Sequence, residues 1–188
     1  MIDNLINIPA GQKNTIEGYM RYQFAGTVAD INVSYVNLLR LIDATPPAQK
    51  PGNDYRLEAQ EIVKTIPISI TVKNDKAGSI QGAFAKCLNE LGFRSGGTNS
   101  RYVLQVDVTV SPVDLPGNKN KFARIEISAN FMDSSVKSVL LPFNYNTREG
   151  HLTETEAVNI AYRKAGEYIE AEYKGVLSNY LSQILPKN

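Results

Sequence analysis

His151 is the only histidine of the chain and the first side chain to consider for acid–base chemistry. It lies in the segment REGHLTETE, with the carboxylates of Glu149, Glu154 and Glu156 close by in sequence. An imidazole beside a carboxylate can act as a general acid or base. However, no serine or cysteine nucleophile stands in a recognisable motif, and loops that lead into helices often carry such charges. We therefore interpret this segment as a polar surface loop and predict that the chain is not an enzyme.

Cys87 is the only cysteine, which excludes an internal disulfide and any zinc site built on several thiolates. It falls on the apolar stripe of a predicted helix, where a thiol is buried and inert. A single histidine is too few for the common multi-histidine metal sites, and no calcium loop is present. We expect neither a metal nor a cofactor.

The glycine-containing segment GFRSGGTNSRY (92–102) does not fit a phosphate-binding loop, because no Lys-Ser/Thr pair and no helix follow it directly. We predict a turn at Gly96-Gly97, where Arg94 and Arg101 offer the chance of anion binding. Lys and Arg total 20 against 19 for Asp and Glu, and the two signs are interleaved. This balance predicts no nucleic-acid partner.

The elements that must position these residues are clearest in the second half of the chain. ISITV (68–72) predicts a strand, and the apolar spacing of Ser79–Gly92 predicts a helix that ends at Gly92. Three segments with alternating apolar and polar residues then predict a strand meander with one wet face, over 102–110, 122–133 and 137–146. Pro142 should lie near an edge or a bulge of this sheet.

A long amphipathic helix is predicted from Thr153 to Leu185. Thr153 can cap its start, with Glu156 as the reciprocal residue of a capping box. The order strand, helix, three strands, long helix predicts an α+β fold in which two helices pack on one face of an antiparallel sheet. We place this sandwich domain at 54–188.

Residues 1–53 form an N-terminal extension whose middle part is ambiguous. Val28, Ile31, Tyr35, Leu38, Leu39 and Ile42 fit a helical stripe, whereas Ala29, Ile31, Val33 and Tyr35 alternate with polar neighbours. The β-branched residues favour a strand, so we predict a β-rich extension with a hairpin formed by 18–26 and the segment after it. The three prolines of 44–53 predict a linker after the hairpin.

The second half resembles a known group of proteins. The strand pair with a turn at Asp133, then Gly150, and the helix start Thr153-x-x-Glu156-Ala157 resemble bacterial envelope lipoproteins of the LpoB, FlgO and TolB N-terminal type and small Lpp-type outer-membrane lipoproteins. The resemblance covers about residues 66–185. It implies a non-enzymatic module of the cell envelope that binds another envelope protein or assembles with itself. The lipidated cysteine of such proteins has no counterpart near the N-terminus, and Cys87 cannot replace it.

The partner-binding surface predicted from the sequence is the exposed side of the last helix with the loop before it, namely Tyr162, Tyr173, Tyr180, Arg148 and His151. Tyrosine is favoured at interfaces because it joins a large apolar body to a polar tip. The alternative is a small-molecule or glycan-binding module, with a pocket between the N-terminal extension and the sheet lined by Tyr19, Tyr22, Phe24 and Tyr35.

Residues 1–14 lack the basic start and apolar core of a secretory signal. This leaves two expectations for location. One is the periplasmic side of the envelope, with a leader and any lipid anchor outside this sequence, and the other is the cytoplasm.

Overall fold

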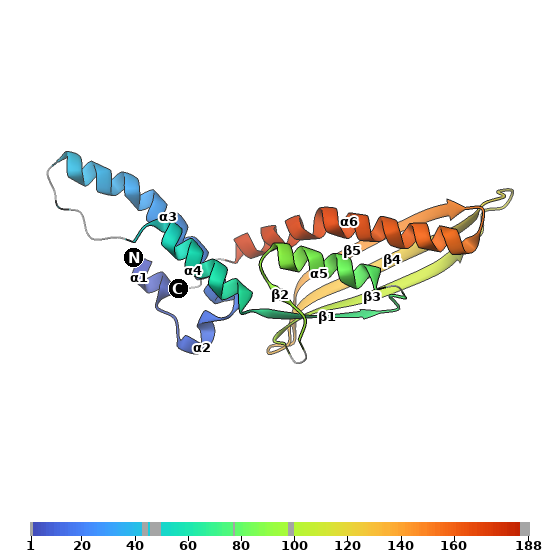
Figure 1. Ribbon diagram of the computed structural model, residues 1–188, viewed down its shortest axis with the longest axis horizontal. Helices are drawn as coiled ribbons and strands as arrows, with labels where there is room; N and C mark the ends of the chain where they lie inside the picture. The colour runs from blue at the N-terminus through green and yellow to red at the C-terminus, as the bar shows by residue number, and fades with distance from the viewer. Residues whose placement is uncertain (1, 43–44, 46–49, 77, 98–99, 185–188) are drawn as a thin grey trace. The chain divides into compact units, whose positions relative to one another are not determined.

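The computed structural model describes residues 2–42, 45, 50–76, 78–97 and 100–184. The chain divides into two compact units (Figure 1). One is helical and comprises Met1–Ile66 with Tyr180–Asn188, and the other contains the sheet and comprises Pro67–Asn179. Residues 54–66 thus group with the helical unit, whereas the predicted boundary lies at residue 53.

The sheet unit has five strands in the order β2-β1-β3-β4-β5. Their bounds are β1 Pro67–Lys73, β2 Arg94–Ser95, β3 Tyr102–Val113, β4 Lys121–Asp133 and β5 Ser138–His151. Strands β3, β4 and β5 form the predicted antiparallel meander. Strand β1, however, is parallel to β3, so the sheet is mixed where an antiparallel one was predicted. The reason is that helix α5 (Ser79–Glu90) returns the chain to the end at which β1 began, which makes a crossover connection.

Helices α5 and α6 (Glu154–Gln183) lie on the same face of the sheet (Figure 1). Along α6, Ala157, Ala161 and Ala165 are fully buried, and their small side chains let the helix approach the strands closely. The backbone N–H of Glu156 donates to the Thr153 hydroxyl at 3.3 Å, as expected of the predicted cap. The predicted α+β class, with both helices on one face, is therefore confirmed.

Cys87 lies between the two helices and is 1% exposed. Its thiol donates to the backbone oxygen of Ile169 at 3.5 Å, and burial raises the pKa of the thiol. Both features favour the neutral thiol over the reactive thiolate. The prediction of a buried cysteine is confirmed.

The helical unit corrects the predicted β-rich extension. It consists of α1 (Ile2–Ile6), α2 (Ala10–Lys13), α3 (Ile16–Leu41) and α4 (Gly52–Lys64). Helix α3 replaces the hairpin and begins at Thr15, whose hydroxyl accepts the backbone N–H of Gly18 at 3.1 Å. The helical spacing of its apolar residues and this N-cap outweigh the strand preference of its β-branched residues. Half of the predicted linker 44–53 falls outside the described residues, namely 44 and 46–49, while Gly52 and Asn53 open α4.

Helices α3 and α4 pack closely where two glycines meet. A Cβ atom on Gly26 would lie 2.9 Å from the backbone oxygen of Gly52 and 3.0 Å from Cγ of Arg56. Arg56 also pairs with Asp30 across the same junction.

Within the described residues, no helix combines the length and apolar character needed to cross a membrane.

Candidate functional site

The outer edge of β5 is the most extended set of unpaired backbone groups in the sheet unit. β5 has 14 residues, and in the described part of the chain it pairs only with β4. Because a proline has no N–H, Pro142 fits the ladder only where the N–H would point away from β4. The register stays regular from Leu141 to His151, so Asn144, Asn146 and Arg148 direct their N–H groups outward as well. These residues can add a strand from another chain.

The first part of this edge is less open to pairing. The register shifts between Phe131 and Met132, which places an extra residue, Leu140, in β5 two positions before Pro142. A bulge and a proline both obstruct the addition of a strand. Pro142 thus lies on an edge strand near a bulge, as predicted. The accessible stretch is therefore Phe143–His151.

An aromatic pair borders the accessible edge. The rings of Tyr145 on β5 and Tyr168 on α6 stack with centroids 4.0 Å apart and an angle of 18° between their planes. Tyr168 is 39% exposed, and Tyr145 is partly exposed. Stacked tyrosines offer a rigid apolar surface with polar tips, which suits partner contact. No sequence pattern marks this pair, because its two members lie on different elements.

Arg148 and His151 lie at the far end of β5. The Arg148 guanidinium lies over the Phe122 ring, 5.9 Å from its centroid. His151 stands opposite Lys121 in the ladder, and its Nδ1 atom is buried without a hydrogen-bond partner in the described structure. None of the nearby carboxylates bonds to this nitrogen in the described structure. The segment 147–151 is strand and not the loop that the sequence suggested.

Tyr173 does not lie on an exposed surface, which corrects the sequence analysis. Its side chain is 0% exposed and packs edge-on against Phe84 and Phe143, with centroid distances of 4.8 and 5.2 Å. Burial raises the pKa of Tyr173, and its hydroxyl has no hydrogen-bond partner in the described structure. Tyr173 is thus a core residue at the centre of an aromatic cluster between both helices and the sheet.

The other two predicted tyrosines are half-buried. The hydroxyl of Tyr162 donates to the backbone oxygen of Asn74 at 2.8 Å, which ties α6 to the loop after β1. Burial raises the pKa of Tyr162. Tyr180 groups with the helical unit. The five predicted residues therefore do not form one surface, and only Arg148 and His151 lie on the β5 edge.

The sheet face away from the helices is polar and adjoins this edge. It carries a shallow hollow of about 270 Å³ whose polar lining comes from three strands and includes Asp107, Thr109, Glu126, Ser128, Asn144 and Asn146. Lys73 pairs with Asp107 at 3.3 Å on the same face. Flat polar surfaces of this kind lack the enclosure that small-molecule sites usually have.

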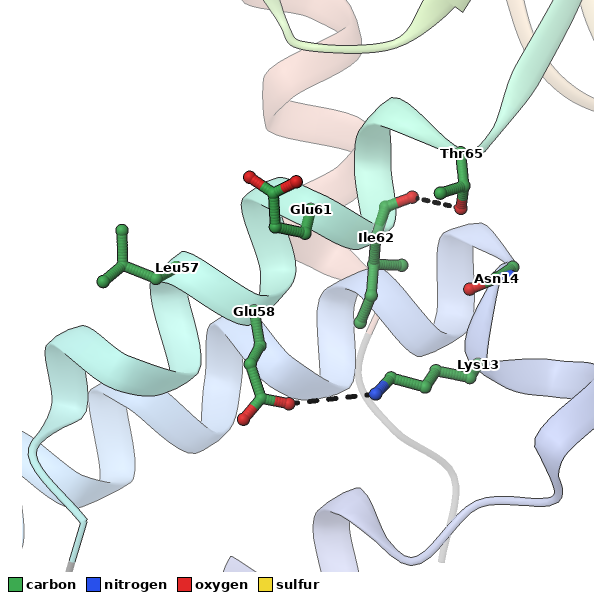
Figure 2. A pocket seen from close by; sticks show the side chains of 7 residues that line it. All are labelled: Lys13, Asn14, Leu57, Glu58, Glu61, Ile62 and Thr65. Atoms are coloured by element: carbon green, nitrogen blue, oxygen red, sulfur yellow. Dashed lines mark hydrogen bonds and ion pairs between the residues drawn. The ribbon is translucent and has the colours of Figure 1, made fainter.

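The helical unit has a groove of about 400 Å³ (Figure 2). Helix α4 supplies Leu57, Glu58, Glu61 and Ile62, while Lys13 reaches in from α2 and forms an ion pair with Glu58 at 3.8 Å. The tyrosines of the predicted glycan pocket do not line this groove. They belong to α3, where Tyr22 is buried and Tyr35 is 57% exposed, because a helix turns these residues toward different sides.

No group of His, Cys, Asp and Glu side chains among the described residues is arranged to hold a metal ion. Neither a protein-family model nor a curated protein sequence matches the chain.

Several solved structures of bacterial lipoproteins are similar to part of the chain. A minor lipoprotein from Acinetobacter baumannii has 16% identity and a TM-score of 0.47, over 58% of this chain and 93% of that one. Lipoprotein GNA1162 from Neisseria meningitidis has 12% identity and a TM-score of 0.38, over 60% and 98%. The rare lipoprotein B from Shewanella oneidensis has 12% identity and a TM-score of 0.35, over 62% and 94%. The LpoB, FlgO and TolB N-terminal type stays a prediction.

Proposed function

We propose that this protein is a non-enzymatic module of the bacterial cell envelope that binds a protein partner on the edge of β5. The envelope location is supported by the resemblance in the strand pair, Gly150 and the start of the last helix. The single observation that carries the binding mode is the unpaired outer edge of Phe143–His151. A partner segment in extended conformation would pair with the outward N–H and C=O groups of Asn144, Asn146 and Arg148.

The side chains beside this edge supply specificity. On the helix side the partner strand would meet the Tyr145–Tyr168 pair, and on the other side it would meet Asn144, Asn146 and Arg148. The side chains of a strand alternate between its two faces, so the fitting partner places apolar residues at every second position, with polar or acidic residues between them.

A proline substitution on the edge tests this proposal. Asn146→Pro removes an outward N–H without removing a bond to β4, and Asn146→Ala is the matched control because it keeps the N–H. Binding to partners in detergent-solubilised envelopes, measured by affinity capture with unfolding temperature as the fold check, should fall with proline and persist with alanine. Equal binding by both variants would exclude strand addition at this site.

The groove in the helical unit favours a second candidate, the binding of a small molecule or glycan. Its volume of about 400 Å³ lies within the usual range for ligand sites. A thermal-shift screen with peptidoglycan fragments tests this function, because a ligand that binds only the folded state raises the unfolding temperature. A shift that disappears in Glu58→Ala would support it, and the lack of any shift would count against it.

A further inference from the structure

Helix α3 carries an apolar stripe that α4 does not cover. Its members recur in alternating steps of four and three residues, and they are Phe24, Val28, Ile31, Tyr35, Leu38 and Ile42, the last directly after the helix. This alternation gives the average period of 3.5 residues at which two helices pack as a coiled coil. At 100° per residue, the buried Gly26 and Ala29 lie on another side of the helix, where Gly26 meets α4.

The stripe is open to solvent along most of its length. Ile31 is 67% exposed, Tyr35 and Leu38 are each 57% exposed, and Ile42 is 68% exposed. Leu41 lies beside the stripe and is 81% exposed. Since a buried aromatic side chain covers about 150–250 Å², side chains at these exposures offer on the order of 100 Å² each. The patch is thus larger than the scattered apolar residues that a surface normally carries.

We propose that a second copy of this chain covers the stripe, with the two α3 helices antiparallel. The five apolar side chains in or beside the stripe that are more than half exposed are Ile31, Tyr35, Leu38, Leu41 and Ile42. At about 100 Å² each from both copies they would bury roughly 1,000 Å² in total, which is at the lower limit for a specific interface. In a dimer with twofold symmetry, both copies use the same surface, so that surface must be complementary to itself. Here the positions beside the stripe carry no charge, since they are Ala25, Thr27, Asn32, Ser34, Leu39 and Leu41.

Charge also argues for a protein copy over a lipid surface. Between residues 22 and 39 the only charged side chain is Asp30, which pairs with Arg56 of α4. Helices that lie on membranes usually carry several Lys and Arg residues on their polar face. A neutral stripe therefore fits another neutral stripe without like-charge repulsion.

The antiparallel orientation matches the sizes of the side chains. It sets Phe24 opposite Ile42, Val28 opposite Leu38, and Ile31 opposite Tyr35, so each layer pairs a larger side chain with a smaller one. A parallel pair would place Tyr35 on Tyr35 and Val28 on Val28, which overfills one layer and underfills another. The helix dipoles also oppose each other in the antiparallel pair.

Sedimentation of the full chain, from low micromolar to submillimolar concentration, tests the proposal. We expect a monomer–dimer equilibrium in the unaltered protein. Ile31→Glu combined with Leu38→Glu should weaken dimerisation at least about a hundredfold, because pairing would bury the new carboxylates. Val33→Glu is the matched control, since Val33 is 50% exposed on the opposite side of α3 and its variant should dimerise normally. A monomer at all concentrations, or equal loss with Val33→Glu, would overturn the proposal.

Thiol cross-linking tests whether the two α3 helices are antiparallel. It uses cysteine variants, so no charged residue has to be introduced into the stripe. Ile31→Cys and Tyr35→Cys chains, mixed in equal amounts, should cross-link to each other more than either does to itself. Cys87 is buried and gives little background. Preferential linkage of Ile31→Cys to itself would overturn the antiparallel pairing.

This contact is separate from the β5 edge, so Asn146→Pro should leave dimerisation unchanged. The two proposals can therefore fail independently.

Discussion

The guanidinium of Arg101 donates two hydrogen bonds to one carboxylate oxygen of Asp133, at 2.9 Å from Nε and 2.7 Å from Nη2. Asp133 is 5% exposed and ends β4, while Arg101 directly precedes β3. The other carboxylate oxygen accepts the backbone N–H and the hydroxyl of Ser135. One carboxylate thus fixes the start of β3, the end of β4 and the turn toward β5.

This carboxylate should make stability depend on pH. Burial by itself would raise the pKa of Asp133, but the hydrogen bonds from Arg101 and Ser135 outweigh it and lower the pKa. A lowered pKa in the folded state contributes stability that is fully present above the unfolded value of about 3.9. That contribution is lost as the pH falls through the lower folded value.

Asp133→Asn should therefore cost about 1–3 kcal/mol of unfolding free energy at neutral pH. The difference from the unaltered protein should begin to shrink as the pH falls below about 4 and should vanish below the lower pKa of the folded state, where the folded aspartate is protonated too. Urea unfolding at a series of pH values measures both quantities. A difference that stays constant down to strongly acidic pH would show that the charge of Asp133 does not stabilise the fold.

Substitutions at Tyr173 should distinguish the contribution of its ring to stability from that of its hydroxyl. Tyr173→Phe removes a buried hydroxyl that has no hydrogen-bond partner in the described structure, so stability should be unchanged or rise by up to about 1 kcal/mol. Tyr173→Ala removes the centre of the aromatic cluster and should cost about 3–5 kcal/mol. Thermal unfolding of both variants checks this. A clear loss with phenylalanine would mean that the hydroxyl is satisfied by an internal water molecule.

Tyr145 and Tyr168 should be coupled in stability. A double-mutant cycle with alanine at each position should give an interaction free energy of about 0.5–1.5 kcal/mol, as expected for stacked aromatic rings. Each single variant should also weaken partner capture if the pair borders the binding edge. Additive effects of the two substitutions on unfolding would contradict the stacking in solution.

Gly26→Ala should destabilise the helical unit although alanine is the better helix former. In an open helix interior this change stabilises by about 0.5–1 kcal/mol. At Gly26 the new methyl group would press on the Gly52 backbone and force α3 and α4 apart. Gly175→Ala in α6 is the control, because a Cβ atom there meets no other atom within 4 Å. The unfolding temperature should fall for the first variant and rise for the second.

The sheet unit was largely predictable because its strands alternate and its helices carry caps and long apolar stripes. In β3, Leu104, Val106 and Val108 are buried and Gln105, Asp107 and Thr109 are exposed, as the alternation predicts. The parallel placement of β1 could not be predicted in this way. It depends on where α5 returns the chain, and that is a tertiary property.

In α3 the sequence supported two periods at once. Ile31 and Tyr35 belong both to the alternating set and to the helical stripe, and strand propensity decided the prediction wrongly. At the candidate site, the place of Tyr173 in the core depends on Phe84 and Phe143, which come from other elements. The pairing of Tyr145 with Tyr168 likewise has no signature along the chain.

The helical unit contains residues from both ends of the sequence, since Leu181 near the end of α6 groups with α1–α4 and is 5% exposed. During synthesis on a ribosome, α1 to α4 emerge before the sheet unit, and this part of their core arrives only after the described strands β1 to β5 have been translated. These helices therefore stay incompletely covered while the sheet unit is translated. Chaperones that shield nascent chains would meet this protein at its N-terminal helices.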